Sequence, residues 1–195
     1  MEVYELILKR RSIRRFRQKA IEFDLLKKIV NSARVAPSAA NLQFLEYIII
    51  DDHKLVESIF PLTRWAAYIY PQGTPKEGER PPVYIAVLIN LNKSKNPDLR
   101  DVGAAVENMI LTALSFGIGS CWLGAINKEE ISKLLKLPPH IKLDSLLALG
   151  YPLEEPIMVE DDENIKYWRD EGGKHYVPKR SLSSILFHNE YGNRC

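Results

Sequence analysis

The chain has 195 residues, of which 46% are hydrophobic and 27% are charged, with only 10 glycines and 12 prolines. This composition is that of a globular protein and excludes collagen-like, low-complexity and disordered chains. The net charge is +2, but six basic residues lie between positions 9 and 17, which leaves −4 on the remainder. We therefore expect one domain over residues 1–195, with a local anion site on a mildly acidic body.

The first 41 residues predict two helices joined by extended backbone. The first helix carries four residues at helical spacing on one face: Val3, Leu6, Ile7 and Arg10. An arginine on that face needs an anionic partner. Residues 12–16 alternate, which favours extended backbone, and a second helix is expected over 22–35. Pro37 disfavours helical backbone at the residue before it, so residues 37–41 are expected to form a loop.

The middle of the chain predicts two buried strands, over residues 44–50 and 83–89. A short apolar helix is expected near residues 55–60. Residues 71–82 contain four prolines and two glycines and are the most loop-like stretch.

A long helix is expected over residues 99–116, ended by Gly117, and a strand over 120–125. Residues 109–126 carry no charge and approach membrane-spanning length. Glycines interrupt the second half of this run, so a buried helix followed by a buried strand explains it better.

The last third predicts a helix that Asn127 begins and that runs to about Leu137, then a strand over 146–149. Ser181 is expected to cap a short helix through Leu186. Helices thus interleave with about four strands. This order indicates a single layered α/β-type domain and leaves the strand order of the sheet open.

Most motifs that bind phosphate or carry a nucleophile are missing from the sequence. Gly119 and Gly124 have P-loop spacing, but Ala125 and Ile126 stand where lysine and serine or threonine are required. Cys121 lies in an apolar run and is expected to be an inert buried thiol. The four histidines show no metal-ligand spacing, so no metal site is expected.

The cysteines and the N-terminus favour a cytoplasmic protein. Cys121 and Cys195 are too few for a disulfide framework and suit a reducing compartment. Glu2 and Glu5 make the N-terminus unlike a signal peptide. No membrane partner is expected.

The basic segment 9–17 has three interpretations from its residues alone. It is a solvated helix end, a nucleic-acid-binding arm, or a site for a small phosphorylated ligand. No base-reading motif accompanies it, and the rest of the chain is acidic, so nucleic acid is the weaker of the two binding interpretations.

Four segments, taken together and in this order, resemble the FMN-dependent nitroreductase family. They are RRSIRRF at 10–16, APSAANLQ at 36–43, the segment 103–126 that contains Trp-Leu-Gly, and LALGYP at 147–152. The tail PKRSL at 178–182 also fits. The resemblance implies an α+β fold of three layers, α/β/α, with a central, mostly antiparallel sheet in an intertwined homodimer.

The resemblance also implies cofactor-binding roles within the basic segment, which includes Arg11. Arg10 and Ser12 would contact the FMN phosphate and ribityl chain, and Arg14 the pyrimidine edge of the ring. A positive side chain at that edge would raise the flavin potential.

The remaining implied cofactor-binding residues come from three other segments. A loop would reach the flavin that the other subunit mainly binds, through Pro37, Ser38, Asn41 and Gln43. Leu123 and Gly124 would lie along the ring. Lys179 and Arg180 would close on the phosphate.

The activity that the resemblance implies is two-electron transfer from NAD(P)H through FMN to a nitroaromatic, quinone or similar acceptor, in ping-pong order. The cofactor performs the chemistry, so no side chain is assigned as an essential acid or base. Two alternatives stay open: a flavin carrier or sensor with little turnover, and a nucleic-acid-binding module that uses residues 9–17.

The segment 61–82 departs from the larger relatives, which carry helices over the active site there. Four of its residues are candidates to line the pocket instead: Arg64, Trp65, Tyr68 and Tyr70.

Overall fold

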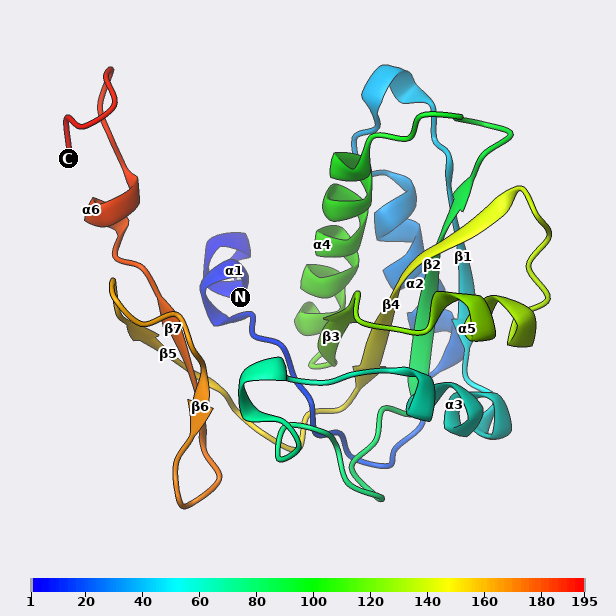
Figure 1. Cartoon of the computed structure of the whole chain (residues 1–195), viewed down its shortest axis with the longest axis horizontal. Helices are drawn as coiled ribbons and strands as arrows, with labels where there is room; N and C mark the ends of the chain where they lie inside the picture. Colours follow the sequence, from blue (N-terminus) through cyan, green and yellow to red (C-terminus); the bar gives the residue numbers. More distant parts are fainter. Residues whose placement is uncertain (1, 195) are drawn as a thin grey trace.

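The computed structural model describes residues 2–194 and is built around a four-stranded sheet (Figure 1). Its strands are β1 (Leu45–Ile50), β2 (Val83–Asn90), β3 (Gly119–Leu123) and β4 (Ile141–Gly150). Their order is β1-β2-β4-β3, and every neighbouring pair is antiparallel. The three predicted strands that precede β4 are confirmed within two residues, whereas β4 begins five residues before the predicted strand.

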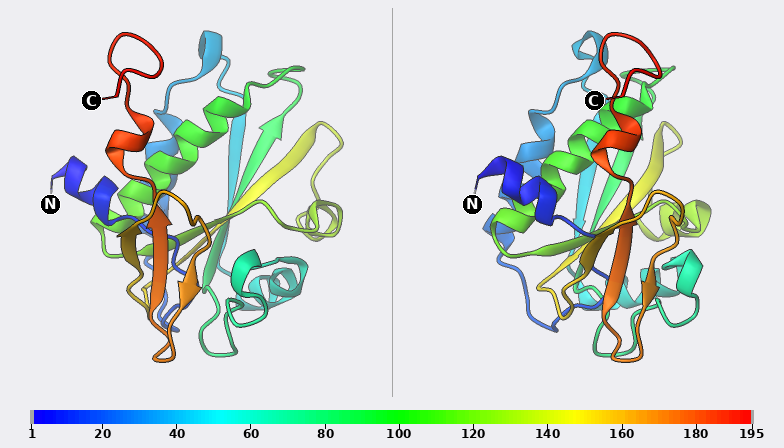
Figure 2. Two further views of the ribbon diagram at one scale, coloured as in Figure 1. Left: turned by 60° about the vertical axis from the view of Figure 1, so that its left-hand side comes forward. Right: turned by 90° about the vertical axis from the view of Figure 1, so that its left-hand side faces the viewer.

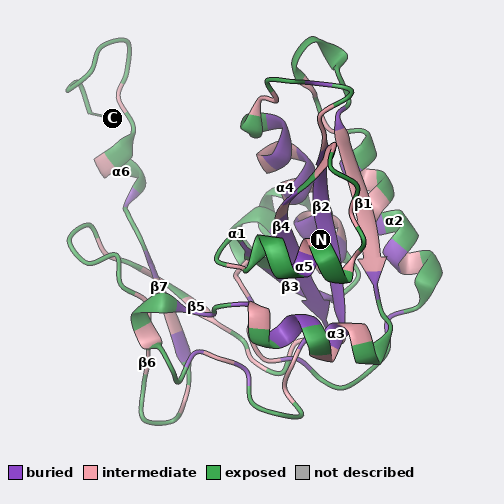
Figure 3. Cartoon of the chain, turned by 45° about the vertical axis from the view of Figure 1, so that its right-hand side comes forward, coloured by how far each residue is buried: buried purple, intermediate pink, exposed green. Residues whose placement is uncertain are grey.

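The central strand β2 is buried on both faces, as Figure 3 shows. Tyr84, Ala86 and Leu88 belong to one apolar cluster. Val83, Ile85 and Val87 alternate with them and belong to the other. This period of two in a strand that is apolar throughout requires a covering layer on each side.

Two pairs of helices supply those layers. Leu26 and Met109 bring α2 (Phe23–Arg34) and α4 (Leu99–Ser115) into the cluster with Ile85. The opposite face is covered by two further helices, α3 (His53–Ile59) and α5 (Lys128–Leu134). The result is a three-layer α+β arrangement with an antiparallel sheet, which confirms the fold class expected from the resemblance.

Two predicted helix ends are present, whereas α5 ends at Leu134 and not near Leu137 as predicted. Asn127 caps α5 by accepting a hydrogen bond from the backbone N–H of Glu130 at 3.2 Å. Gly117 follows α4 with a φ of +72°, a conformation that favours glycine. The uncharged run 109–126 divides into the end of α4 and all of β3, and within residues 2–194 no helix could span a membrane.

Helix α1 (Val3–Lys9) differs from its expected role because only Leu6 on it is buried. Val3 and Ile7 are 68% and 46% exposed, so the apolar face predicted for this helix is not buried in the chain. The segment after α1 is extended, as predicted. Ser12 forms a parallel bridge to Ser120 of β3, and Phe16 is fully buried in the core.

A second sheet, which the sequence pattern did not predict, lies beside the main body (Figures 1 and 2). It consists of β5 (Ile157–Glu160), β6 (Trp168–Arg169) and β7 (His175–Lys179), in the order β5-β7-β6. The short helix α6 (Leu182–Ile185) follows and is capped by Ser181, as predicted. Single-turn 3₁₀ helices lie in the connections: η1 (Ala39–Asn41), η2 (Phe60–Leu62) and η3 (Ala67–Ile69).

Candidate functional site

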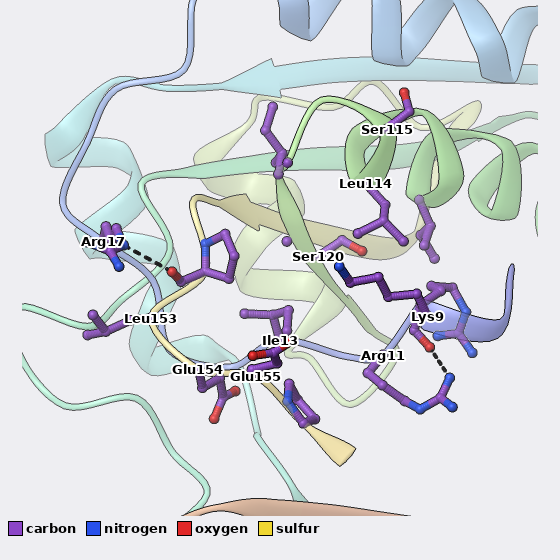
Figure 4. A pocket seen from close by; sticks show the side chains of 17 residues that line it. Lys9, Arg11, Ile13, Arg17, Leu114, Ser115, Ser120, Leu153, Glu154 and Glu155 are labelled. Carbon is purple, nitrogen blue, oxygen red and sulfur yellow. Dashed lines mark hydrogen bonds between the residues drawn. The ribbon is translucent and has the colours of Figure 1, made fainter. Parts of the chain in front are cut away.

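A cavity of about 670 Å³ lies between the ends of α1 and α4, the start of β3 and residues 152–156 (Figure 4). Its size is that of a small-molecule site. Its apolar walls include Ile13, Ile110, Leu114 and Ile118. Its charged residues are Lys9, Arg10, Arg11, Arg17, Glu154 and Glu155.

The arginines of this cavity are engaged to different degrees. Arg10 forms an ion pair with Glu107 of α4, with 3.4 Å between Nε and Oε1. The anionic partner that the sequence required for Arg10 is therefore present in the chain itself. Arg17 donates to the backbone carbonyl of Pro152 at 3.2 Å. The Nη1–H of Arg11 donates to the backbone carbonyl of Arg10, while its buried Nε has no hydrogen-bond partner within residues 2–194. Burial, and then the charge of Arg10, lower the pKa of Arg11.

Ser12 and Arg14 lie outside the lining of this cavity. The backbone N–H of Arg14 donates to Oε1 of Glu154 at 2.6 Å. Its guanidinium contacts His175 and lies over the ring of Tyr167, 5.0 Å from the ring centroid. The buried Nε of Arg14, like that of Arg11, has no partner in the part of the chain that the structure describes.

The predicted loop 37–43 is organised by Asp101, a buried carboxylate in the first turn of α4. Ser38 Oγ donates to Asp101 Oδ2 at 2.7 Å, and the backbone N–H of Ala39 donates to both carboxylate oxygens at 3.0–3.1 Å. The backbone N–H of Gln43 in turn donates to Ser38 Oγ at 3.1 Å. Sequence reasoning missed Asp101 because nothing local connects it to a loop 62 residues earlier.

This loop also holds non-glycine residues in left-handed backbone conformations. The φ angles are +49° at Ala40, +53° at Asn41 and +48° at Gln43. Such conformations persist only where surrounding contacts impose them, and they cluster at functional sites. The side chains of Asn41 and Gln43 are exposed, while Pro37, Ser38 and Gln43 line a separate pocket of about 300 Å³.

Leu123 is the last residue of β3 and Gly124 follows it, away from both the cavity at Arg11 and the loop 37–43. Leu123 is buried in the core, and Gly124 is exposed with open space where a Cβ would stand. The next residue, Ala125, accepts a hydrogen bond from the backbone N–H of Arg64 at 2.9 Å. Both Arg64 and Ala125 line a pocket of about 460 Å³.

The candidates in the segment 61–82 therefore have different positions. Arg64 lines the pocket of about 460 Å³ and not the cavity that Arg10 and Arg11 share. Trp65 belongs to the buried core and donates its Nε1–H to Thr63 at 2.8 Å, while Tyr68 and Tyr70 are exposed. A buried indole with a satisfied N–H is a packing residue rather than a pocket wall.

Lys179 and Arg180 are exposed at the end of β7 and lie outside the cavity lining. Arg180 donates to the backbone carbonyl of Ser184 at 2.8 Å. The predicted site residues thus form separate groups in one chain. Arg10 and Arg11 share the largest of the three cavities described here, and the loop 37–43, the end of β3 and the Lys179–Arg180 pair lie apart from it.

Within the described residues, neither Cys121 nor a metal-ligating cluster supplies a second reactive centre. Cys121 is buried, and burial raises the pKa of its thiol, which makes it a poor nucleophile, as expected. Among residues 2–194, no three His, Cys, Asp or Glu side chains are grouped so that they could hold a metal ion.

Comparisons with known proteins agree with this architecture. A family model described as the nitroreductase family matches residues 7–151. A protein of Archaeoglobus fulgidus is 32% identical over 83% of this chain and 92% of its own. It carries the provisional name NADH dehydrogenase/NAD(P)H nitroreductase.

Solved structures give the same result. A nitroreductase family protein from Clostridium novyi is 32% identical, with a TM-score of 0.67 over 78% of this chain and 87% of its own. A provisionally named nitroreductase from Desulfovibrio desulfuricans, crystallised with FMN, has a TM-score of 0.74 at 24% identity over 98% of both chains. With the family model, the relatives and the three-layer fold in agreement, the chain belongs to the nitroreductase family.

Proposed function

We propose that this chain is an FMN-dependent oxidoreductase that passes two electrons from NAD(P)H to a nitroaromatic, quinone or similar acceptor in ping-pong order. The observation that carries the proposal is the pair of buried, unpartnered Nε–H donors of Arg11 and Arg14 within residues 2–194. Both lie in one short segment, in which Arg11 lines the apolar-walled cavity and Arg14 lies outside its lining. A buried donor without a partner is costly, so the Nε–H of Arg11, unpartnered among the described residues, is suited to a polar ligand at this cavity.

The residues present fit FMN, which has an anionic phosphate and a flat apolar ring. Arg10, Arg11 and Ser12 would hold the phosphate end, together with Lys179 and Arg180, because guanidinium groups suit bidentate phosphate contacts. Arg14 would donate to the polar edge of the ring. Bound FMN would supply hydride acceptance and two-electron donation, chemistry that no side chain of this chain provides.

The separation of the candidate residues supports a site completed by a second copy of the chain. Asp101 holds the loop 37–43 in a strained backbone, with Asn41 and Gln43 exposed. We propose that this loop, with Pro37 and Ser38, reaches the flavin held mainly by the partner. Leu123 and Gly124 would flank the ring.

The basic segment is less suited to nucleic acid than its composition indicates. Arg15 is paired with Glu79, and Arg17 holds its guanidinium against a backbone carbonyl. An arginine whose charge is already neutralised, as that of Arg15 is, releases few counterions from a nucleic acid.

The decisive experiment is the visible spectrum of the purified protein before and after anaerobic addition of NADH or NADPH. The proposal predicts a yellow protein that bleaches and regains its colour when a quinone is added. A yellow protein that neither donor bleaches would indicate a carrier. A colourless protein that does not take up added FMN would refute the proposal.

Two variants test the shared site. We expect Arg11→Ala to weaken FMN binding at least tenfold in a fluorescence titration, while Lys142→Ala, an exposed cation at the start of β4, has no effect. If two copies build each site, each mixed dimer of an Arg11→Ala chain with an Asn41→Ala chain should regain one intact site of its two. No restoration in mixed dimers would contradict the shared site.

A further inference from the structure

The second sheet places a buried charged cluster against Arg14. Glu154 accepts from the backbone N–H of Arg14 with one carboxylate oxygen and forms an ion pair with Arg169 of β6 with the other. The side chains of Glu154 and Arg169 are only 7% and 9% exposed. The carboxylate therefore joins the segment that contains Arg14 to the second sheet, through groups that water hardly reaches.

The guanidinium of Arg14 is held from the same sheet. Its Nη1 lies 3.2 Å from Nε2 of His175 in β7, a residue that is 1% exposed. Arginine has no acceptor, so it donates and His175 accepts, which places the ring proton on Nδ1. The Tyr167 ring packs on both groups: Arg14 lies over it, and its centroid is 5.5 Å from that of His175.

The charges of this cluster do not cancel. Arg14 and Arg169 are positive, Glu154 is negative, and His175 is neutral as an acceptor. Burial, and then the charges of Arg14 and Arg169, lower the pKa of His175 to about 4, against an opposing contribution from Glu154. One buried positive charge is left without a counter-charge within the cluster, and Arg14 still has an unused Nε–H among the described residues. Such a charge favours a neighbouring group that gains electron density.

We propose that His175 and Glu154 are positioning residues that fix the direction of the Arg14 guanidinium, so that the second sheet tunes the potential of a bound flavin. The inference rests on the proposed function, because it takes Arg14 to face the electron-rich edge of the flavin. Glu154 fixes the backbone at Arg14, and His175 with Tyr167 fixes the side chain. A guanidinium held in this way stabilises the reduced, more negative form of a flavin more than the oxidised form.

The first test needs no flavin. In wild-type protein labelled with ¹⁵N, the ring nitrogens of His175 should report a neutral imidazole at pH 6, with Nδ1 protonated and Nε2 accepting. A doubly protonated His175 ring at pH 6 would overturn the inference, whether or not the protein binds FMN.

The second test compares the midpoint potential of bound FMN in three variants with that of wild type. His175→Leu removes the acceptor, and His175→Gln keeps an acceptor oxygen. His53→Leu is the control, because it replaces an exposed histidine of α3 by leucine. In His175→Leu we expect the affinity for reduced FMN to fall about tenfold more than that for oxidised FMN, which lowers the potential by about 30 mV for a two-electron couple. The potential of His175→Gln should lie close to that of wild type, and the potential of His53→Leu should equal it.

Two outcomes separate this inference from the proposed function. A His175→Leu protein that binds FMN with an unchanged potential would overturn the inference and leave the proposed function intact. A wild-type protein that binds no FMN would overturn both. A purely structural role would destabilise His175→Leu without the selective loss of affinity for reduced FMN.

Discussion

The two sheets of this chain are stabilised by different interactions. The four-stranded sheet is buried on both faces by apolar side chains, as in β2, where seven of eight residues are buried. The three-stranded sheet alternates between half-buried and exposed residues in β5 and contacts the 10–16 segment through Arg14, Glu154, Arg169 and His175. Burial of apolar area is non-directional and tolerant, whereas a buried charged network depends on every partner. The main sheet is therefore suited to provide stability, and the small one to hold a side chain in one direction.

The largest expected effect tests the apolar half of this comparison. Leu146 of β4 is fully buried in the cluster that α3 and α5 cover. Leu146→Ala should lower the free energy of unfolding by about 4 kcal/mol, because it removes buried methyl groups and leaves a cavity. Urea unfolding measures the change. Leu134→Ala, at an exposed leucine of α5, is the matched control and should cost less than about 1 kcal/mol. Equal losses in the two variants would contradict a stability dominated by the main sheet.

The buried charged cluster of the second sheet gives the next prediction. Glu154→Gln should lower the free energy of unfolding by about 3 kcal/mol. This change keeps an acceptor for the Arg14 backbone but leaves Arg169 buried without a counter-charge, which costs more than the pair contributes. The double variant Glu154→Met with Arg169→Met should lower the free energy of unfolding clearly less than Glu154→Gln does, because it leaves one uncompensated positive charge in the cluster, as in wild type, and not two. If the double variant were the less stable of the two, the pair itself would be a major source of stability.

The same contrast explains what the sequence could predict. Strands β1, β2 and β3 and the helices over them follow from apolar periodicity, and Pro37, Gly117, Asn127 and Ser181 mark helix ends through local chemistry. The second sheet has strands of only two to five residues, which are too short for a period to be detected in the sequence.

The candidate site likewise contains residues that local motifs predict and residues that only long-range contacts reveal. The basic segment and the loop 37–43 are visible as local motifs. Asp101, Glu154 and His175 act through partners 62, 140 and 161 residues away, and nothing in the neighbouring residues indicates those contacts.

A smaller effect is expected from pH and concerns His175. The pKa of His175 is about 4 in the folded chain and about 6.5 when unfolded. Between these values the unfolded chain binds more protons, so stability should fall as the pH is lowered from 6.5 to 4, by at most about 1.4 kcal/mol per pH unit. This group contributes no pH dependence above about pH 7.5.

Unfolding in urea at pH 5 and pH 8 measures this dependence. His175→Gln should remove the part due to His175, whereas His53→Gln, at an exposed site, should keep it. An unchanged pH dependence in His175→Gln would show that the ring is not held neutral by burial and by the arginines.

The smallest expected effect comes from removing one helix cap in each of the two regions, at Asn127 beside the main sheet and at Ser181 after the second sheet. Asn127 caps α5, which packs on the main sheet through Ile131, and Ser181 caps α6, none of whose residues is buried. Each change to alanine removes a cap worth about 1 kcal/mol, and Ser181→Ala also removes the 2.7 Å hydrogen bond that Ser181 Oγ donates to Asp162. Asn127→Ala should lower the free energy of global unfolding by that amount, because α5 is part of the cooperative core.

Ser181→Ala should leave global unfolding unchanged and speed amide hydrogen exchange only near residues 181–186, because a region with few buried apolar contacts opens locally. If Ser181→Ala instead lowered global stability as Asn127→Ala does, α6 and the main sheet would unfold as one cooperative unit, and the division of the chain into two differently stabilised regions would be wrong.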